Sequence, residues 1–177
     1  GQVLSIYAKH GVMIGILYQF EGGMDKIDAK IVQALQEDGR LTNQDLAEKI
    51  GLSPSPCLRR VRNLEKAGII KAYSATIDQK ACGYPITCFV RIRLSIHTED
   101  TIQKFEKIVE ETPEILDCYL MAGGSDYQLR VVTGSLDEYE QLVRQTFQKL
   151  PGISSVETSF AYGVVKKSRV LPVKINT

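Results

Sequence analysis

The side chains best suited to recognising another molecule lie in one short stretch, GLSPSPCLRRVRNLEKAG, at residues 51–68. Guanidinium and carboxamide groups can form paired hydrogen bonds with base edges in the major groove of DNA. Serine hydroxyls and the free backbone amides at the start of a helix can bind phosphate. The stretch therefore predicts contacts with double-stranded DNA, and the predicted contact residues are Asn43, Ser53, Ser55, Arg59, Arg60, Arg62, Asn63 and Lys66.

A helix that begins at Pro54 would present these groups on one side. Proline at the first helical position forfeits no hydrogen bond, because that N–H would have no partner within the helix, and Ser53 or Ser55 could cap it. At about 100° per residue, one side of the helix collects Cys57, Leu58, Val61 and Leu64. The other side collects Ser55, Arg59, Asn63 and Lys66, with Arg60 and Arg62 on its flanks. A run of charges is often only a solvated face, so the surrounding elements decide the interpretation.

Two more helices are predicted before this one. Residues 25–38 carry apolar side chains at helical spacing and end at Gly39. A second, short helix begins after Thr42, in a Thr-x-x-Asp capping pattern, and ends at Gly51. After the third helix, residues 69–78 are rich in Ile, Tyr and Thr and are predicted to form a strand. This order indicates a winged helix-turn-helix, with a small helical bundle for protein contacts as the alternative.

The charge distribution agrees with a local DNA contact. The net charge of the 177 residues is +1, but residues 57–73 hold five basic side chains against one acidic side chain. The four cysteines (Cys57, Cys82, Cys88 and Cys118) and two histidines (His10 and His97) lack metal-ligand spacing. We therefore predict no metal, no cofactor, and reduced thiols in a cytoplasmic protein.

The second half of the chain has a different periodicity. Strict alternation over residues 87–96 predicts a strand. The elements predicted after it are a helix at 99–111, strands at 115–122 and 127–133, a helix at 136–150 and a strand at 153–165. This βαββαβ order predicts an α+β fold with a ferredoxin-like antiparallel sheet and helices on one face. The uncovered face of such a sheet often pairs with another chain, so we predict a dimer.

The turn between the two central strands is the second candidate site. Glycines allow a ligand to approach the backbone, and successive N–H groups can hold a carboxylate. An aspartate can pair with an ammonium group, and neighbouring apolar side chains can contact the rest of a ligand. The predicted ligand-binding residues are Met121, Ala122, Gly123, Gly124, Asp126 and Tyr127. The alternative is an ordinary hairpin turn.

Four segments together resemble the Lrp/AsnC, or feast/famine, family of transcription regulators. They are IDAKIVQALQEDGR, DLAEKIGLSPSPCLRRVRNLE, AGIIKAY and MAGGSDYQLRV, and the resemblance covers residues 24–171. It implies a DNA-binding domain at 24–73, a linker at 74–86 and a ligand-binding RAM domain at 87–171. It also implies dimers that assemble further, commonly into octamers, and an amino-acid effector. Gly124-Ser125 replaces a pair that is often bulkier or acidic in the family, so the resemblance does not identify the effector.

Other classes of function fit the sequence less well. Ser53, Ser55 and Cys57 have no nearby histidine to activate them, and His97 has no implied acidic partner, so catalysis is not predicted. The remaining alternative is a metabolite-binding module whose helical domain serves protein contacts. Residues 1–23 are predicted to be a leader without function. Their apolar part is too short to span a membrane. Residues 172–177 are predicted to be a tail.

Overall fold

The structure is a computed structural model that describes residues 24–148, 150 and 152–175. The predicted leader at 1–23 lies outside the described residues. The chain divides into two compact units. The sheet unit comprises the described residues of Ile77–Val164, and the helical unit comprises residues 24–76 and 165–175. Residues 165–171 lie within the segment predicted as the C-terminal domain, and their contacts group them with the helical unit.

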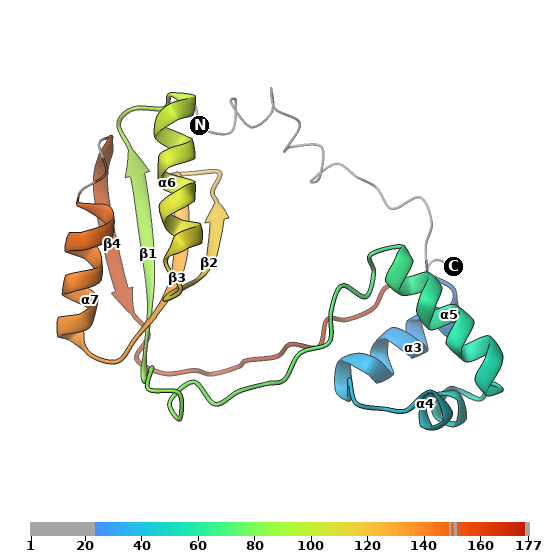
Figure 1. Cartoon of the computed structure of the whole chain (residues 1–177). Helices are drawn as coiled ribbons and strands as arrows, with labels where there is room; N and C mark the ends of the chain where they lie inside the picture. Colours follow the sequence, from blue (N-terminus) through green and yellow to red (C-terminus); the bar gives the residue numbers. More distant parts are fainter. Residues whose placement is uncertain (1–23, 149, 151, 176–177) are drawn as a thin grey trace. The chain divides into compact units, whose positions relative to one another are not determined.

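Three helices form the helical unit, as predicted, and Figure 1 shows them in blue to green: α3 (Lys26–Glu37), α4 (Asn43–Ile50) and α5 (Pro54–Lys66). Thr42 caps α4 by accepting a hydrogen bond from the Asp45 amide. Gly51 then ends α4 in the left-handed conformation (φ 75°), which glycine adopts without steric cost. These local signals fix the tight turn between α4 and α5.

The core of the helical unit comes from all three helices: Ile31, Ala34, Leu46, Ala47, Ile50, Cys57 and Leu64. Leu58 is an exception to the predicted apolar side of α5, because 39% of it is exposed. It lies about 100° around the helix from Cys57, at the edge of the buried stripe. Leu58 therefore contributes an apolar group to the outer surface.

The predicted strand at 69–78 is not formed: the structure describes all of these residues, and none of them is in a strand. A strand needs a neighbour that forms a hydrogen-bonded ladder with it, and composition alone does not supply one. Instead, residues 169–175 return to the helical unit, where the Leu171 amide donates to Gln36 Oε1 over 2.7 Å and Gln36 Nε2 donates to the Leu171 carbonyl over 3.1 Å.

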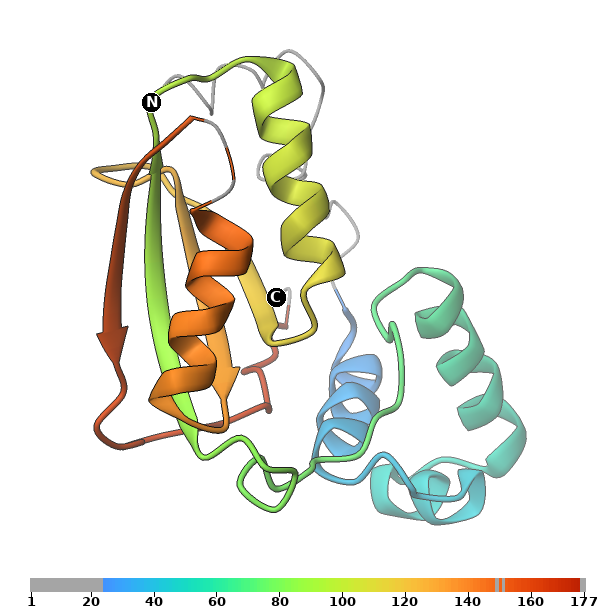
Figure 2. The ribbon, with the colours of Figure 1, turned by 60° about the vertical axis from the view of Figure 1, so that its left-hand side comes forward.

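The sheet unit has the predicted βαββαβ order. Its elements are β1 (Ile86–Leu94), α6 (Glu99–Glu111), β2 (Ile115–Leu120), β3 (Tyr127–Thr133), α7 (Leu136–Leu142) and β4 (Ile153–Phe160). All strand pairs are antiparallel, and the strand order is β2-β3-β1-β4. Both helices cover the same face of the sheet (Figures 1 and 2). Alternate β1 side chains pack under them, and the others (Phe89, Arg91 and Arg93) point to the open face.

The last predicted helix departs from regular geometry. A π-helical turn, Val143–Phe147, follows α7. Thr146 is half-buried, whereas its neighbour Phe147 is completely buried. Eight residues separate Tyr139 from Phe147, one more than two α-helical turns, and the wider π turn absorbs the extra residue. Both rings thereby face the sheet.

Candidate functional site

The outer side of α5 carries most of the predicted DNA contacts. Ser55, Arg59, Arg62, Asn63 and Lys66 are all exposed. Within the part of the chain that the structure describes, Arg59, Arg62 and Lys66 form no ion pair. Exposed Leu58, which was predicted on the apolar side and not as a DNA contact, lies next to Arg59. An apolar side chain there could contact a thymine methyl group. This side of the helix presents cations, an amide and one apolar group together.

The start of α5 has unused hydrogen-bonding groups. Ser53 occupies the N-cap position, but its side chain makes no capping hydrogen bond, so the proposed serine cap is not formed in this structure. Pro54 and Pro56 lack backbone N–H groups, and no acidic residue lies in the first turn. The exposed serine hydroxyls remain available to an anion at this positive end of the helix.

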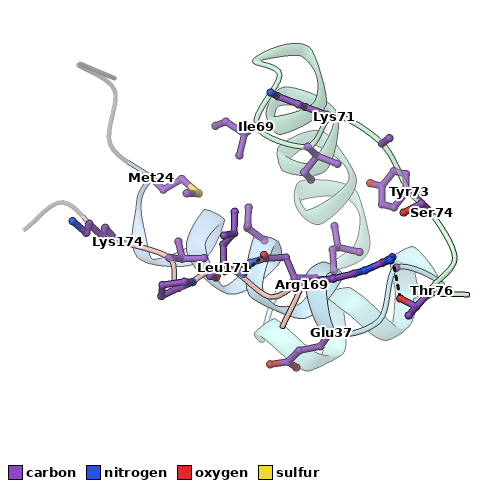
Figure 3. Close-up of a pocket in the computed structure, with 18 residues that line it drawn as sticks. Met24, Glu37, Ile69, Lys71, Tyr73, Ser74, Thr76, Arg169, Leu171 and Lys174 are labelled. Carbon is purple, nitrogen blue, oxygen red and sulfur yellow. Dashed lines mark hydrogen bonds between the residues drawn. The ribbon is translucent and has the colours of Figure 1, made fainter. Parts of the chain in front are cut away.

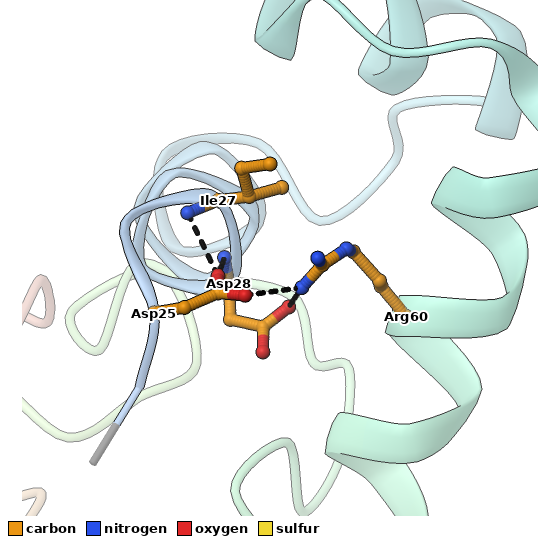
Figure 4. Close-up of polar contacts among 4 residues, drawn as sticks. All are labelled: Asp25, Ile27, Asp28 and Arg60. Carbon is orange, nitrogen blue, oxygen red and sulfur yellow. Dashed lines mark hydrogen bonds and ion pairs between the residues drawn. The ribbon is translucent and has the colours of Figure 1, made fainter.

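Arg60 differs from its neighbours because it points towards α3 (Figure 4). Its Nη1 lies 2.7 Å from Asp25 Oδ2 and 2.8 Å from Asp28 Oδ1. Hydrogen bonds from the Asp28 amide and the Arg60 guanidinium lower the pKa of Asp25. The pKa of Arg60 is raised by its hydrogen bonds to Asp28 and Asp25. Arg60 therefore differs from the outward cations, because its ion pairs with Asp25 and Asp28 hold α5 against the start of α3.

Asn43 has an internal role in the turn. Its Nδ2 donates a 2.9 Å hydrogen bond to the carbonyl of Pro54, which joins the first residue of α4 to the first residue of α5. Its Oδ1 is buried and has no hydrogen-bond partner among the described residues. The Asn43 side chain is therefore placed to fix the angle between the two helices.

The 121–127 loop consists of the connection between β2 and β3 (residues 121–126) and the first residue of β3, Tyr127. The Met121 amide donates a 2.8 Å hydrogen bond to the Asp126 carbonyl, which closes the loop. Ala122, Gly123 and Gly124 are exposed, and Gly123 has a φ of 152°, which L-residues rarely adopt. Tyr127 lies beneath the loop in the core, with its ring centroid 4.4 Å from that of Phe105. Burial raises the pKa of its phenol.

Asp126 already has partners within the chain. Its Oδ2 accepts a 2.7 Å hydrogen bond from the Leu94 amide and lies 3.2 Å from His97 Nε2. The sequence analysis implied no acidic partner for His97, and this was wrong, because the fold brings together residues 29 positions apart. The Asp126 carboxylate ties the 121–127 loop to the end of β1.

Arg93 approaches the same loop from β1. Its Nη2 donates a hydrogen bond to the Gly124 carbonyl. A cavity of about 220 Å³ opens beside it, bordered by Arg91, Ile92, Arg93, Gly124, Ser125, Ser155 and Glu157. Neither Arg93 nor Ser125 was among the predicted site residues. The alternation of β1 places Arg93 on the open face, but no local pattern indicates that this position lies beside the loop.

A larger groove, of about 1000 Å³, lies within the helical unit (Figure 3). It is bordered by α3, by residues 69–76 and by residues 169–174 of the returning tail. Arg169 and Thr76 are joined across it by a 3.4 Å hydrogen bond. This groove was not predictable from local sequence patterns, because it depends on the contact of residues 169–174 with α3.

No group of three or more His, Cys, Asp or Glu side chains in the described part of the chain is arranged to hold a metal ion. Over those same residues, no helix has both the length and the apolar character that crossing a membrane requires.

Two family profiles match the chain. Residues 24–71 match a winged helix-turn-helix DNA-binding domain, and residues 87–171 match the Lrp/AsnC ligand binding domain. The chain is 39% identical over 138 residues to the Bkd operon transcriptional regulator of Pseudomonas aeruginosa, covering 78% of this chain and 90% of that protein. It is 36% identical over 151 residues to the leucine-responsive regulatory protein of Escherichia coli strain K12, covering 85% and 92%.

Solved structures give the same picture. A Neisseria meningitidis transcriptional regulator in complex with L-Met superposes with a TM-score of 0.80 at 36% identity, over 84% of this chain and 96% of that one. AsnC of E. coli superposes with a TM-score of 0.77 at 25% identity, over 84% and 99%. The likeness thus extends over both units.

Proposed function

Since the chain belongs to the Lrp/AsnC family of DNA-binding transcriptional regulators, we propose that α5 reads its DNA site and that the 121–127 loop binds an amino-acid effector. The observation that carries the DNA part is the outer side of α5. There Arg59, Arg62 and Lys66 are exposed and lack acidic partners within the described residues, while Arg60 is ion-paired on the inner side. A helix with this division can enter the major groove with its free cations towards DNA.

The proposed DNA contacts have different roles. Ser53, Ser55 and the first turn of α5 are proposed to bind phosphate, and Arg59 and Asn63 to reach base edges. Arg62 and Lys66 add positive charge beside the groove. Asn43 acts through its hydrogen bond to the Pro54 carbonyl, which orients the recognition helix. Arg60 stabilises the domain and is not proposed to contact DNA.

The effector part rests on the exposed backbone of the 121–127 loop. Gly123 and Gly124 leave N–H groups open to a carboxylate, and Met121 is half-buried beside them. The Neisseria regulator whose structure resembles this chain is in complex with L-Met, which supports an amino acid as the class of effector. Ala122 borders the loop opening, whereas Asp126 and Tyr127 hold the loop in place from below.

Selection of bound sites from random double-stranded DNA, with and without each of the twenty amino acids, tests both parts. We expect enrichment of a roughly palindromic sequence whose recovery changes with at least one amino acid. Absence of any enriched sequence would contradict the DNA part. Enrichment that no amino acid alters, together with no amino-acid binding in calorimetry, would contradict the effector part. Amino-acid binding without DNA enrichment would favour the alternative of a metabolite-binding module whose helical unit serves protein contacts.

We propose that the chain acts without catalysing a reaction, in the cytoplasm, and as a homodimer that assembles further, with an octamer as the expected form. The related proteins are bacterial transcriptional regulators, which supports the first two statements. The open face of the sheet supports the third. Helices cover only one face, and Phe89 is 38% exposed on the other, between β3 and β4.

We predict that Phe89→Asp shifts the full-length chain towards monomer at micromolar concentration, because a carboxylate would be buried in the proposed interface. Analytical ultracentrifugation measures the change. Leu136→Asp is the matched control, since Leu136 is 59% exposed at the start of α7, where an acidic residue suits the helix. Equal assembly of Phe89→Asp, Leu136→Asp and wild type would contradict an interface on the open face.

A further inference from the structure

We infer that Arg93 binds the α-carboxylate of the effector, and that Asp126 is a positioning residue that anchors the loop. This inference rests on the proposed effector function of the 121–127 loop. It assigns the charge recognition to a residue outside the loop, on β1. It also implies that a free carboxylate is required in any ligand of this site.

The surroundings of Asp126 make it a poor receptor for an ammonium group. Its side chain is 14% exposed, and Oδ2 already receives the Leu94 amide and faces His97 Nε2. Its backbone N–H donates to the Ile92 carbonyl over 2.9 Å, and its carbonyl accepts from Met121. A ligand cation at Oδ2 would compete with the Leu94 amide, which would lose its partner if displaced, and with the contact to His97. The main role of the Asp126 carboxylate is therefore to hold the loop against the end of β1.

The arginines of the sheet differ in whether they have a carboxylate partner. Arg91 pairs with Glu157 at 3.0 Å, and Arg130 pairs with Asp117. Among the described residues, Arg93 forms no such pair, and its guanidinium donates a hydrogen bond to the Gly124 carbonyl. A carbonyl oxygen accepts one N–H of the five that a guanidinium offers, and it does not neutralise the charge. Arg93 thus retains both donors and charge for an anion.

The position of Arg93 joins its charge to the loop opening. A methyl group at position 124 would lie 3.6 Å from Arg93 Nη2, so the guanidinium covers this glycine. The cavity of about 220 Å³ beside it is also bordered by Ser125, Ser155 and the Arg91–Glu157 ion pair, in which the Glu157 charge is balanced by Arg91. Sites for complete small ligands usually measure roughly 300–1,000 Å³. This cavity suits the charged end of an amino acid, whose side chain would extend beyond it.

Guanidinium and carboxylate match as paired donors and acceptors, so the interaction favours an amino acid over its amide. Removal of a hydrogen bond to a charged group lowers the binding affinity by about 10- to 100-fold. We therefore expect L-methionine to bind the wild-type chain about 10- to 100-fold more tightly than L-methioninamide. In Arg93→Gln this preference should be largely lost, and the affinity for L-methionine should fall to that of the amide.

The experiment is isothermal titration of both compounds into the full-length wild type, Arg93→Gln, Arg130→Gln and Asp126→Asn. Arg130→Gln is the matched control: it removes the same charge from the neighbouring strand β3, outside the residues that border the cavity, and it should keep the preference for the carboxylate. Asp126→Asn should weaken both compounds by a similar factor and keep their ratio, because it loosens the loop and leaves the receptor in place. Sedimentation of each variant identifies any change of assembly.

The outcomes separate this inference from the proposed function. If L-methionine does not bind, the tightest binder among the twenty amino acids and its amide replace the pair. If no amino acid binds the wild-type chain, the proposed effector function is contradicted, and the inference with it. If the amino acid binds and its amide binds equally well, the inference alone is overturned, even where Arg93→Gln does not fold. The inference also fails if Arg93→Gln retains the wild-type ratio.

Discussion

Replacing Ser55 by aspartate is expected to remove most DNA binding while leaving the helical unit at least as stable as in the wild type. Ser55 is the second residue of α5 and is exposed, and the first turn of α5 contains no acidic residue. A carboxylate there interacts favourably with the helix dipole, by about 0.3–1 kcal/mol. The same carboxylate would lie where we propose that DNA phosphates bind. The substitution therefore has opposite effects on folding and on binding.

The loss of binding should be large because a dimer presents the change twice. The carboxylate removes the serine hydrogen bond to phosphate and adds charge repulsion, for which we expect a cost of about 1–3 kcal/mol per recognition helix, or about 2–6 kcal/mol for two helices. This corresponds to roughly 30-fold to more than 10,000-fold in affinity. Fluorescence anisotropy with a selected DNA site, at two salt concentrations, measures the effect. Thermal unfolding of the same samples measures the stability.

Two further variants make the result specific. Gln145→Glu adds the same charge at an exposed position of the sheet unit and should bind DNA nearly as well as the wild type. Arg59→Ala should cost about 1–3 kcal/mol per helix at the selected site and less at unrelated DNA, if Arg59 reads a base edge. Should Ser55→Asp and Gln145→Glu bind equally well, the start of α5 does not face DNA.

The helices of the helical unit were predictable because their end signals are local. Thr42 caps α4 with the amide of Asp45, three residues away, and Gly51 ends the same helix. Pro54 begins α5 at the predicted residue. Each signal works within one or two helical turns, so the sequence around it contains all the information needed. The strands of the sheet unit followed for a similar reason, since alternating burial is visible residue by residue.

The candidate site was less predictable because its contacts join distant positions. Arg60 has the same residue type as Arg59 and Arg62, and only its ion pairs with α3, more than 30 residues earlier, distinguish it. The partners of Asp126 come from the end of β1, about 30 residues before it. The role of a charged side chain depends on whether an opposite charge lies within a few ångströms, and spacing along the chain does not reveal this.

The errors in secondary structure have the same origin. Residues 69–78 have the composition of a strand, but a strand also needs a neighbouring strand to pair with it. The π turn after α7 allows Tyr139 and Phe147 to lie on the same side of the helix, where both rings pack against the sheet. In both cases tertiary packing overrode the local preference.

Replacing Phe105 by alanine is expected to lower the free energy of unfolding of the sheet unit by about 3–5 kcal/mol. Phe105 is 1% exposed and packs α6 against the sheet. Its ring is tilted by 35° against that of Tyr127, and such aromatic pairs contribute about 0.5–1.5 kcal/mol beyond their buried area. The alanine would leave a cavity directly beneath the 121–127 loop. We therefore expect amino-acid binding to weaken together with stability.

Urea unfolding at a fixed protein concentration tests whether this loss is confined to one unit. The cores of the two units share no residue, so two transitions are expected. Ile31→Ala is the matched variant, because Ile31 is fully buried in the helical unit, and it should cost that unit about 2–5 kcal/mol. Phe105→Ala should lower only the urea midpoint of the transition that far-ultraviolet circular dichroism assigns to the sheet unit. Ile31→Ala should lower only the midpoint of the transition of the helical unit.

If the two transitions move together in either variant, the units fold as one, and an effector could act on DNA binding through their shared stability. If they move separately, Phe105→Ala should retain binding of a single recognition helix to DNA at low salt while losing the response to an amino acid. A ligand can change regulation only through a difference in its affinity for two states of the protein. A loosened loop lowers its affinity for every state, so the response should disappear before the DNA contact does.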